Sequence, residues 1–125
     1  MFGSKSFKLP KDIEVIEFQD RLRFKGTANQ IDQLALEIQQ LSTLKNDQKV
    51  KLGDYSFVIS DIVPILPKRG IIQLPNHAWN IMASKFSEVA NNWEDSPFDF
   101  NDCGYINPKL DFDIGVELIG EPNPR

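Results

Sequence analysis

The order of apolar and polar residues predicts two amphipathic helices. Between positions 28 and 44 the apolar residues recur at helical intervals and form one stripe, which consists of Ile31, Leu34, Ala35, Ile38 and Leu41. Thr27 and Gln30 have the spacing of a capping box in front of this stripe. A second helix is predicted from Pro75 or Asn76 to about Trp93. Its stripe is longer and consists of Trp79, Met82, Ala83, Phe86, Val89, Ala90 and Trp93.

Short runs rich in β-branched and aromatic residues predict the strands. Residues 13–18 and 22–24 are joined by three polar residues and indicate a first hairpin. Residues 50–52 and 55–59 flank Gly53 and Asp54, and a glycine at the first central position suits a tight type II′ hairpin. Residues 71–74 are predicted to form a further short strand. Residues 110–118 alternate apolar positions with polar or glycine positions, which predicts a strand with one face in a core and one in water.

These elements follow one another as ββ-α-βββ-α-β and predict an α+β fold. We expect an antiparallel or mixed sheet with both amphipathic helices packed on one face, because each apolar face needs a partner. Residues 94–109 are rich in Asp, Asn, Pro and Gly and are predicted to form a long loop. Gly26 is interpreted as a turn residue before the helix cap. The 125 residues suit a single globular domain over 1–125 with short frayed tails, the second from Glu121 onward.

Composition places the chain among ordinary globular proteins, with 41% hydrophobic and 26% charged residues. A net charge of −4 argues against general nucleic-acid binding. A single cysteine excludes an intrachain disulfide, so a cytoplasmic location is expected. The first residues lack the apolar stretch of a signal peptide, and no segment approaches the roughly 20 apolar residues of a membrane span. We therefore expect no membrane association.

Residues with catalytic or metal-binding chemistry are few. A Cys–His nucleophile pair would have to join Cys103 to His77, and the sequence indicates no third group to orient them. Residues 99–104 resemble the opening of a calcium loop, but Cys103 replaces an oxygen ligand and Leu110 stands where a bidentate Glu is needed. Turn formation explains this segment without an ion. No glycine-rich phosphate-binding motif occurs. We predict no catalytic residues, no metal and no cofactor, and hence a protein that is not an enzyme.

Charge asymmetry is the one feature above background. Residues 94–125 contain eight acids and two bases, a charge of −6, whereas residues 1–93 carry +2. Acids interleaved with aromatic residues suit an interface that steers and anchors a basic partner. The predicted contacts are Asp95, Phe98, Asp99, Phe100, Asp102 and Tyr105. In the alternative interpretation Asp111, Asp113 and Glu117 are the solvent face of the last strand, where like charges discourage edge-to-edge aggregation.

Two functional hypotheses from different classes follow. The first is a small acidic cytosolic protein-binding module, such as an immunity or inhibitor protein that neutralises a basic toxin or nuclease. The second is an accessory or structural subunit of an oligomeric assembly, whose apolar surface is completed by the other subunits. A small hydrolase is a third hypothesis, and it needs carboxylate chemistry that spacing alone does not identify.

Overall fold

A computed structural model describes residues 5–6, 9–18, 21–41, 43, 49–52, 55–60, 71–92, 98–99 and 113–123. It confirms the α+β class and the predicted order of elements. The two helices are α1 (Ala28–Leu41) and α2 (Asn76–Asn92). The longer strands are β2 (Glu14–Phe18), β3 (Arg21–Gly26), β4 (Lys49–Leu52), β5 (Tyr55–Ile59), β6 (Ile71–Leu74) and β8 (Asp113–Leu118). Two additional two-residue strands are β1 (Lys5–Ser6) and β7 (Phe98–Asp99).

The strands form two mixed sheets where the sequence led us to expect one sheet. Sheet A has the order β1-β4-β5-β6, and sheet B has the order β2-β3-β8-β7. Both predicted hairpins, β2–β3 and β4–β5, are antiparallel as expected. In each sheet the second hairpin strand also pairs in parallel with a strand from elsewhere in the chain, β3 with β8 and β5 with β6. The two sheets therefore share a hairpin whose second strand pairs in parallel with a later strand. Sheet A has a further parallel strand, β1, and sheet B a further antiparallel one, β7.

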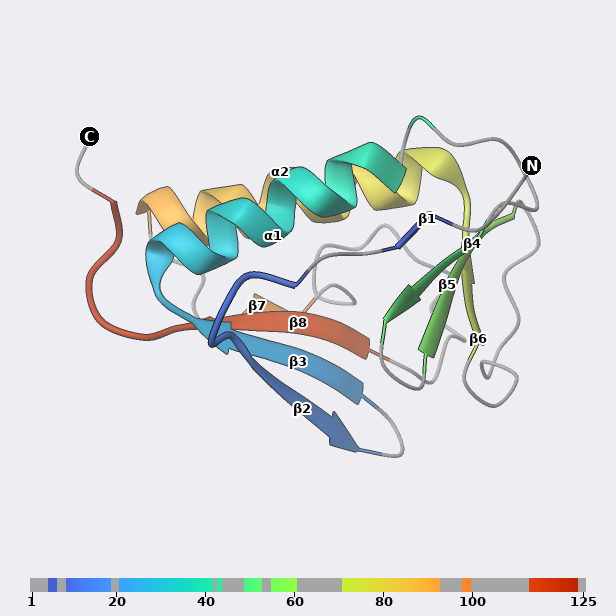
Figure 1. Cartoon of the computed structure of the whole chain (residues 1–125). Coiled ribbons are helices and arrows are strands. Elements are labelled where there is room, and N and C mark those ends of the chain that lie inside the picture. Colours follow the sequence, from blue (N-terminus) through green and yellow to red (C-terminus); the bar gives the residue numbers. More distant parts are fainter. Residues whose placement is uncertain are drawn as a thin grey trace.

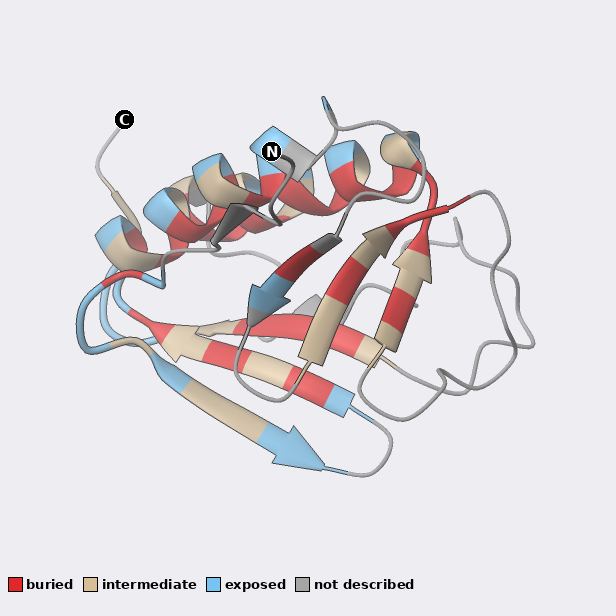
Figure 2. Ribbon diagram, turned by 45° about the vertical axis from the view of Figure 1, so that its right-hand side comes forward, coloured by how far each residue is buried: buried red, intermediate tan, exposed pale blue. Residues whose placement is uncertain are grey.

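The two helices lie side by side in one layer that covers both sheets (Figure 1). The members of the predicted apolar stripes between Ile31 and Ile38 and between Trp79 and Ala90 are buried, as Figure 2 shows in red. Trp93, the last member of the second stripe, lies outside the described residues. One continuous core joins the helices to both sheets. Its largest fully buried side chains are Trp79, Phe24, Phe57, Phe86, Leu22, Ile31, Leu34, Ile38, Ile59 and Leu74.

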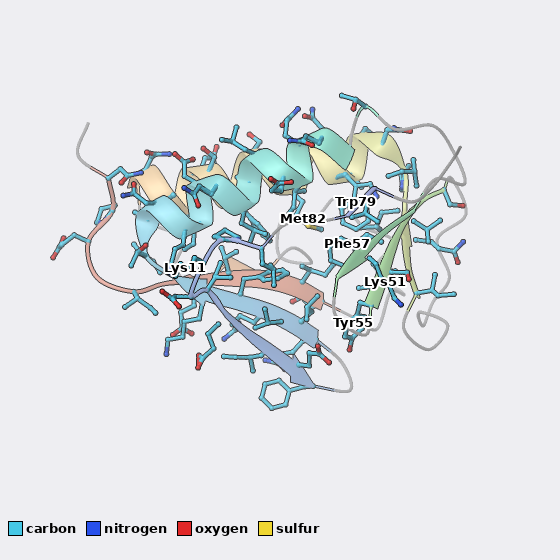
Figure 3. The ribbon with its side chains drawn as sticks, viewed as in Figure 1. Lys11, Lys51, Tyr55, Phe57, Trp79 and Met82 are labelled. Carbon is cyan, nitrogen blue, oxygen red and sulfur yellow. The ribbon has the colours of Figure 1, made fainter. Side chains whose placement is uncertain are left out.

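Two aromatic pairs connect α2 to the sheets. Trp79, near the start of α2, stacks on Phe57 of sheet A with ring centroids 4.9 Å apart, and its indole nitrogen donates to the carbonyl oxygen of Leu74 at 3.0 Å. Figure 3 shows Trp79 and Phe57 together between α2 and sheet A. Two turns further along α2, Phe86 meets Phe24 of sheet B edge to face, with centroids 6.5 Å apart. These offset and edge-to-face geometries are the favoured ones for aromatic rings.

The capping box predicted at the start of α1 is confirmed. The Thr27 amide donates to Gln30 Oε1 at 2.8 Å, and the Gln30 amide donates to Thr27 Oγ1 at 3.3 Å. Gln30 Nε2 also donates to the carbonyl oxygen of Lys11 at 2.6 Å, so the same side chain ties the turn before β2 to the helix. Asp12 of this turn adopts a left-handed conformation with φ 67°, which Asp tolerates better than most residues.

Gly26 serves close packing instead of the turn that the sequence suggested. It is the last residue of β3, where it pairs with Leu118 of β8. A Cβ atom at Gly26 would lie 2.8 Å from Gln30 Oε1 and 3.0 Å from Ile13 Cγ1. The absent side chain thus makes room for the cap and for the approach to β2.

Described residues near both predicted tails make backbone hydrogen bonds to the rest of the fold. Lys5 and Ser6 pair in parallel with β4. Beyond β8, the amide of Asn123 donates to the carbonyl oxygen of Ala90 at 2.8 Å. Ala90 lies in the last turn of α2, where helix carbonyls have no partner within the helix. The tail therefore satisfies one carbonyl of this helix end.

Three features of the helices and strands also differ from the prediction. Helix α1 ends at Leu41 instead of about 44, and both the amide and the hydroxyl of Thr43 donate to the carbonyl oxygen of Gln40. The region predicted as a long loop over 94–109 contains β7. Strand β8 lies between β3 and β7, so it is not an edge strand, and its three consecutive residues Ile114, Gly115 and Val116 are buried instead of alternating.

Replacing Phe86 tests the predicted core face of α2. Phe86→Ala removes a fully buried ring that contacts Phe24 and leaves a cavity, so we expect a loss of about 3–5 kcal/mol in the free energy of unfolding. Leu36→Ala, on the exposed side of α1, is the control and should change it by less than about 0.5 kcal/mol. Denaturant unfolding measures both. A loss below about 1 kcal/mol for Phe86→Ala would contradict this core.

A double-mutant cycle tests the close packing at Gly26. Gly26→Ala should destabilise the protein by about 1–3 kcal/mol, because the new methyl group displaces the Gln30 cap. In a Gln30→Ala background the same change should cost less, since the nearest clashing atom is already gone. Equal costs in the two backgrounds, measured by denaturant unfolding, would show that the cap is not what excludes a side chain at position 26.

Candidate functional site

Of the six predicted partner contacts, the structure places the backbone of two. Phe98 and Asp99 form β7, where Phe98 pairs with Val116 and Asp99 with Gly115. Asp95, Phe100, Asp102 and Tyr105 lie outside the described residues. Strand β7 thus fixes one point of the acidic segment at an edge of sheet B, the edge opposite β2.

Basic residues of β3 neutralise Glu117, one of the two acids of β8. Glu117 Oε1 lies 3.6 Å from Arg23 Nη1, and Glu117 Oε2 lies 3.2 Å from Lys25 Nζ. These three side chains share the sheet face that points away from the helices, because directly paired residues of neighbouring strands lie on the same face. Glu117 is therefore part of an ion-pair network between strands, which replaces the predicted role of repelling another sheet edge.

Strand β2 forms the other edge of sheet B and is its most exposed part. Glu14, Glu17 and Phe18 are exposed, as the pale blue ends of β2 in Figure 2 show, and Phe18 keeps 58% of its surface in water. The guanidinium carbon of Arg21 lies 6.0 Å from the centre of the Phe18 ring, at the limit of a cation–π contact. Sequence reasoning recognised this strand but not its edge position, since no local pattern distinguishes an edge strand from an interior one.

A shallow hollow of about 510 Å³ lies on the outer side of the helix pair. Polar side chains bridge the helices across it: Gln39 Nε2 donates to Asn80 Oδ1 at 2.7 Å, and Ser87 Oγ donates to Asp32 Oδ1 at 3.1 Å. Leu36 borders the hollow and is 66% exposed. The hollow thus combines polar bridges between the helices with one protruding apolar side chain.

The Asp32–Ser87 contact has a structural role. The serine hydroxyl bonds directly to the carboxylate, whereas a catalytic triad needs a histidine between them. His77 is exposed in the first turn of α2, ten residues and hence about 15 Å along the helix from Ser87. Asn91 Nδ2 donates to the Ser87 carbonyl oxygen at 2.8 Å, and Asn123 Nδ2 donates to Asn91 Oδ1 at 3.4 Å. The network therefore links α1, α2 and the tail.

A second hollow, of about 370 Å³, lies on the other side of Leu36. Leu9, which is 37% exposed, supplies further apolar surface here, while Lys11 and Glu37 supply opposite charges. Leu36 stands between the two hollows and belongs to both linings. The outer surface of α1 therefore combines exposed apolar groups with charges of both signs.

The described residues contain no group of three or more His, Cys, Asp or Glu side chains placed to hold a metal ion. Neither α1 nor α2, the two helices in the described part of the chain, is long and apolar enough to cross a membrane. Comparison of the chain with protein-family models, with curated proteins and with solved structures finds no match.

Proposed function

We propose that this protein is a small acidic protein-binding module of the cytoplasm that captures a partner with a basic surface. Its mode of action is that of an inhibitor or immunity protein, which blocks a basic toxin or nuclease by covering its surface. The proposed contacts are Asp95, Phe98, Asp99, Phe100, Asp102 and Tyr105.

The uneven distribution of charge carries this proposal. Residues 94–125 hold a charge of −6, against +2 for the rest of the chain. Within this stretch, Glu117 is compensated by two bases of β3, but Glu121 is exposed and has no ion pair among the described residues. An excess of like charge in one segment produces a long-range field that raises the rate of encounter with an oppositely charged surface.

Aromatic side chains next to the acids supply the second requirement of an interface. Charge at the rim of an interface mainly speeds association, whereas desolvated aromatic anchors slow dissociation. Phe98 and Phe100 flank Asp99 in the sequence, and the backbone of Phe98 and Asp99 is held by pairing with β8. A segment fixed to a sheet loses less conformational entropy on binding than a free one.

Binding kinetics test this function against the partner recovered by pull-down from the native host. The triple variant Asp95→Asn, Asp99→Asn, Asp102→Asn should slow association, and added salt should reduce that difference because the field is screened over about 8 Å at physiological ionic strength. Phe98→Ala and Phe100→Ala should instead speed dissociation.

Neutralisation of acids elsewhere is the control for these variants. Glu37→Gln with Glu88→Gln removes charge from the helix surface and should have a smaller effect per charge on the association rate. Two results together would contradict a role for the acidic segment. The association rate would not depend on salt, and the triple variant would associate as fast as the unmodified chain.

Exposed apolar surface on α1 favours a second candidate, a subunit that pairs with another copy of itself. Leu36 projects between two hollows, and Lys11 and Glu37 line the same hollow. In a two-fold contact around Leu36, both copies present Lys11 and Glu37, because a symmetric interface uses the same patch on each side, so charges of both signs are present across the contact. This function would place the chain in an oligomeric assembly.

The mass in solution tests the second candidate. If the outer surface of α1 pairs two copies, sedimentation should show a mass that rises with concentration, and Leu36→Glu should abolish the rise by placing a charge in the contact. Ile119→Glu, the same type of change at a residue that is 46% exposed beyond β8, is the control and should leave the mass unchanged. A monomeric mass at all concentrations would exclude this pairing.

A further inference from the structure

The outer edge of β2 is the longest open strand edge of the molecule's described part. Sheets A and B end on β1, β6, β2 and β7. Strands β1 and β7 have two residues each, and β6 has four, of which alternate ones are buried. Strand β2 has five residues, and three of these are exposed. Among the described residues no backbone hydrogen bond outside the β2–β3 ladder reaches Glu14–Phe18.

Most of the usual protections of a sheet edge are missing from β2. Edge strands are commonly blocked by proline, by lysine, by a bulge, by short length or by a covering segment. Strand β2 contains neither proline nor lysine, and its register with β3 runs from Glu14–Lys25 to Phe18–Arg21 without an interruption. Figure 1 shows β2 on the side of sheet B farthest from the helix layer. No described segment therefore pairs with the outer backbone edge of β2.

The charges on β2 select what can pair with it. Glu14 and Glu17 are exposed and form no ion pair with the other described residues. Lys25, the register partner of Glu14, lies 3.2 Å from Glu117 instead. Between the two glutamates lie Val15 and Ile16, which are half-buried and face opposite sides of the sheet.

We propose that β2 accepts an extended segment of a partner protein as an additional strand, with the pattern basic–apolar–apolar–basic. The two bases then lie directly opposite Glu14 and Glu17, and the two apolar residues cover Val15 and Ile16. The pattern reads the same in both chain directions, so it suits parallel and antiparallel addition. Among the contacts proposed for the acidic segment, Phe98 and Asp99 lie at the opposite edge of sheet B, and strand addition at β2 does not require that segment to bind.

A second copy of this chain fits the edge poorly. Pairing β2 with another β2 brings four unneutralised carboxylates together along one strand pair, and like charges on paired strands are destabilising. The same carboxylates attract a basic segment. The two glutamates thus discourage self-association and favour an oppositely charged partner at one edge.

A capped peptide of sequence Thr-Lys-Val-Val-Lys-Thr is a suitable probe, measured by fluorescence anisotropy with the full chain. Its isomer Thr-Val-Lys-Lys-Val-Thr has the same composition and charge but places valine opposite the glutamates. We expect the first peptide to bind about tenfold more tightly, because cross-strand charge pairs are gained and apolar pairs are kept.

Backbone methylation separates strand addition from simple charge attraction. In an added strand, the amides of alternate residues point toward the neighbour. Of two peptides N-methylated on the two alternate sets of residues, one should lose binding and the other should retain it. Equal binding by both methylated peptides would overturn the proposal, since attraction between side-chain charges alone does not need the peptide amides.

Reversing the charges of β2 tests whether the peptide binds at this edge. The variant Glu14→Lys, Glu17→Lys should lose at least tenfold in affinity for the lysine peptide and gain affinity for Thr-Glu-Val-Val-Glu-Thr. The control variant Glu37→Lys, Glu121→Lys changes the net charge equally and should keep the original preference. Circular dichroism of both variants checks that the fold is retained, which is expected because Glu14 and Glu17 are exposed.

The peptide experiments also distinguish strand addition at β2 from binding to the acidic segment. The triple variant Asp95→Asn, Asp99→Asn, Asp102→Asn should leave the preference between the two lysine peptides unchanged. A preference that is lost in this triple variant and kept in the Glu14, Glu17 variant would place the peptide on the acidic segment and overturn strand addition at β2. No preference between the two peptides on the unmodified chain would overturn it as well.

Discussion

Helix α2 packs the two sheets into one core, because it contributes a large aromatic side chain above each of them. Trp79 stacks on Phe57 of sheet A, and Phe86 meets Phe24 of sheet B. No backbone pairing joins the described strands of one sheet to those of the other. The arrangement of the sheets, and with it the position of each open edge, therefore depends on packing against one helix face and its neighbour α1.

The helices and hairpins follow from local signals in the sequence, which is why they are predictable. The Thr27–Gln30 box and the recurrence of Ile31, Leu34 and Ile38 specify α1 without reference to the rest of the chain. Hairpin strands need only a short turn between them. The parallel pairs β3–β8 and β5–β6 join segments separated in sequence, and hydrophobic alternation is the same for any partner. For that reason the division into two sheets cannot be predicted from the hydrophobic pattern alone.

Of the two candidate sites, one can be predicted from the sequence and the other requires the structure. Counting acids and bases is enough to propose the segment of residues 94–125 as an interface, and the structure adds the anchoring of Phe98 and Asp99 beside β8. The site at the β2 edge is recognised only from the structure. The structure shows that β2 ends the sheet, that Lys25 pairs with Glu117, and that Glu14 and Glu17 are exposed. In the sequence those glutamates look like the polar half of any alternating strand.

The parallel pairing of β3 with β8 has a consequence for how the chain reaches its folded state. Strand β3 pairs locally with β2 in a hairpin, but its other edge pairs with β8, about ninety residues later in the chain. Contacts between residues so far apart in sequence slow folding. Until β8 arrives, the buried residues Leu22 and Phe24 stand in a strand that is open on one side. Exposed apolar surface and unpaired edges promote aggregation, so a chaperone that binds this nascent hairpin during synthesis would protect it.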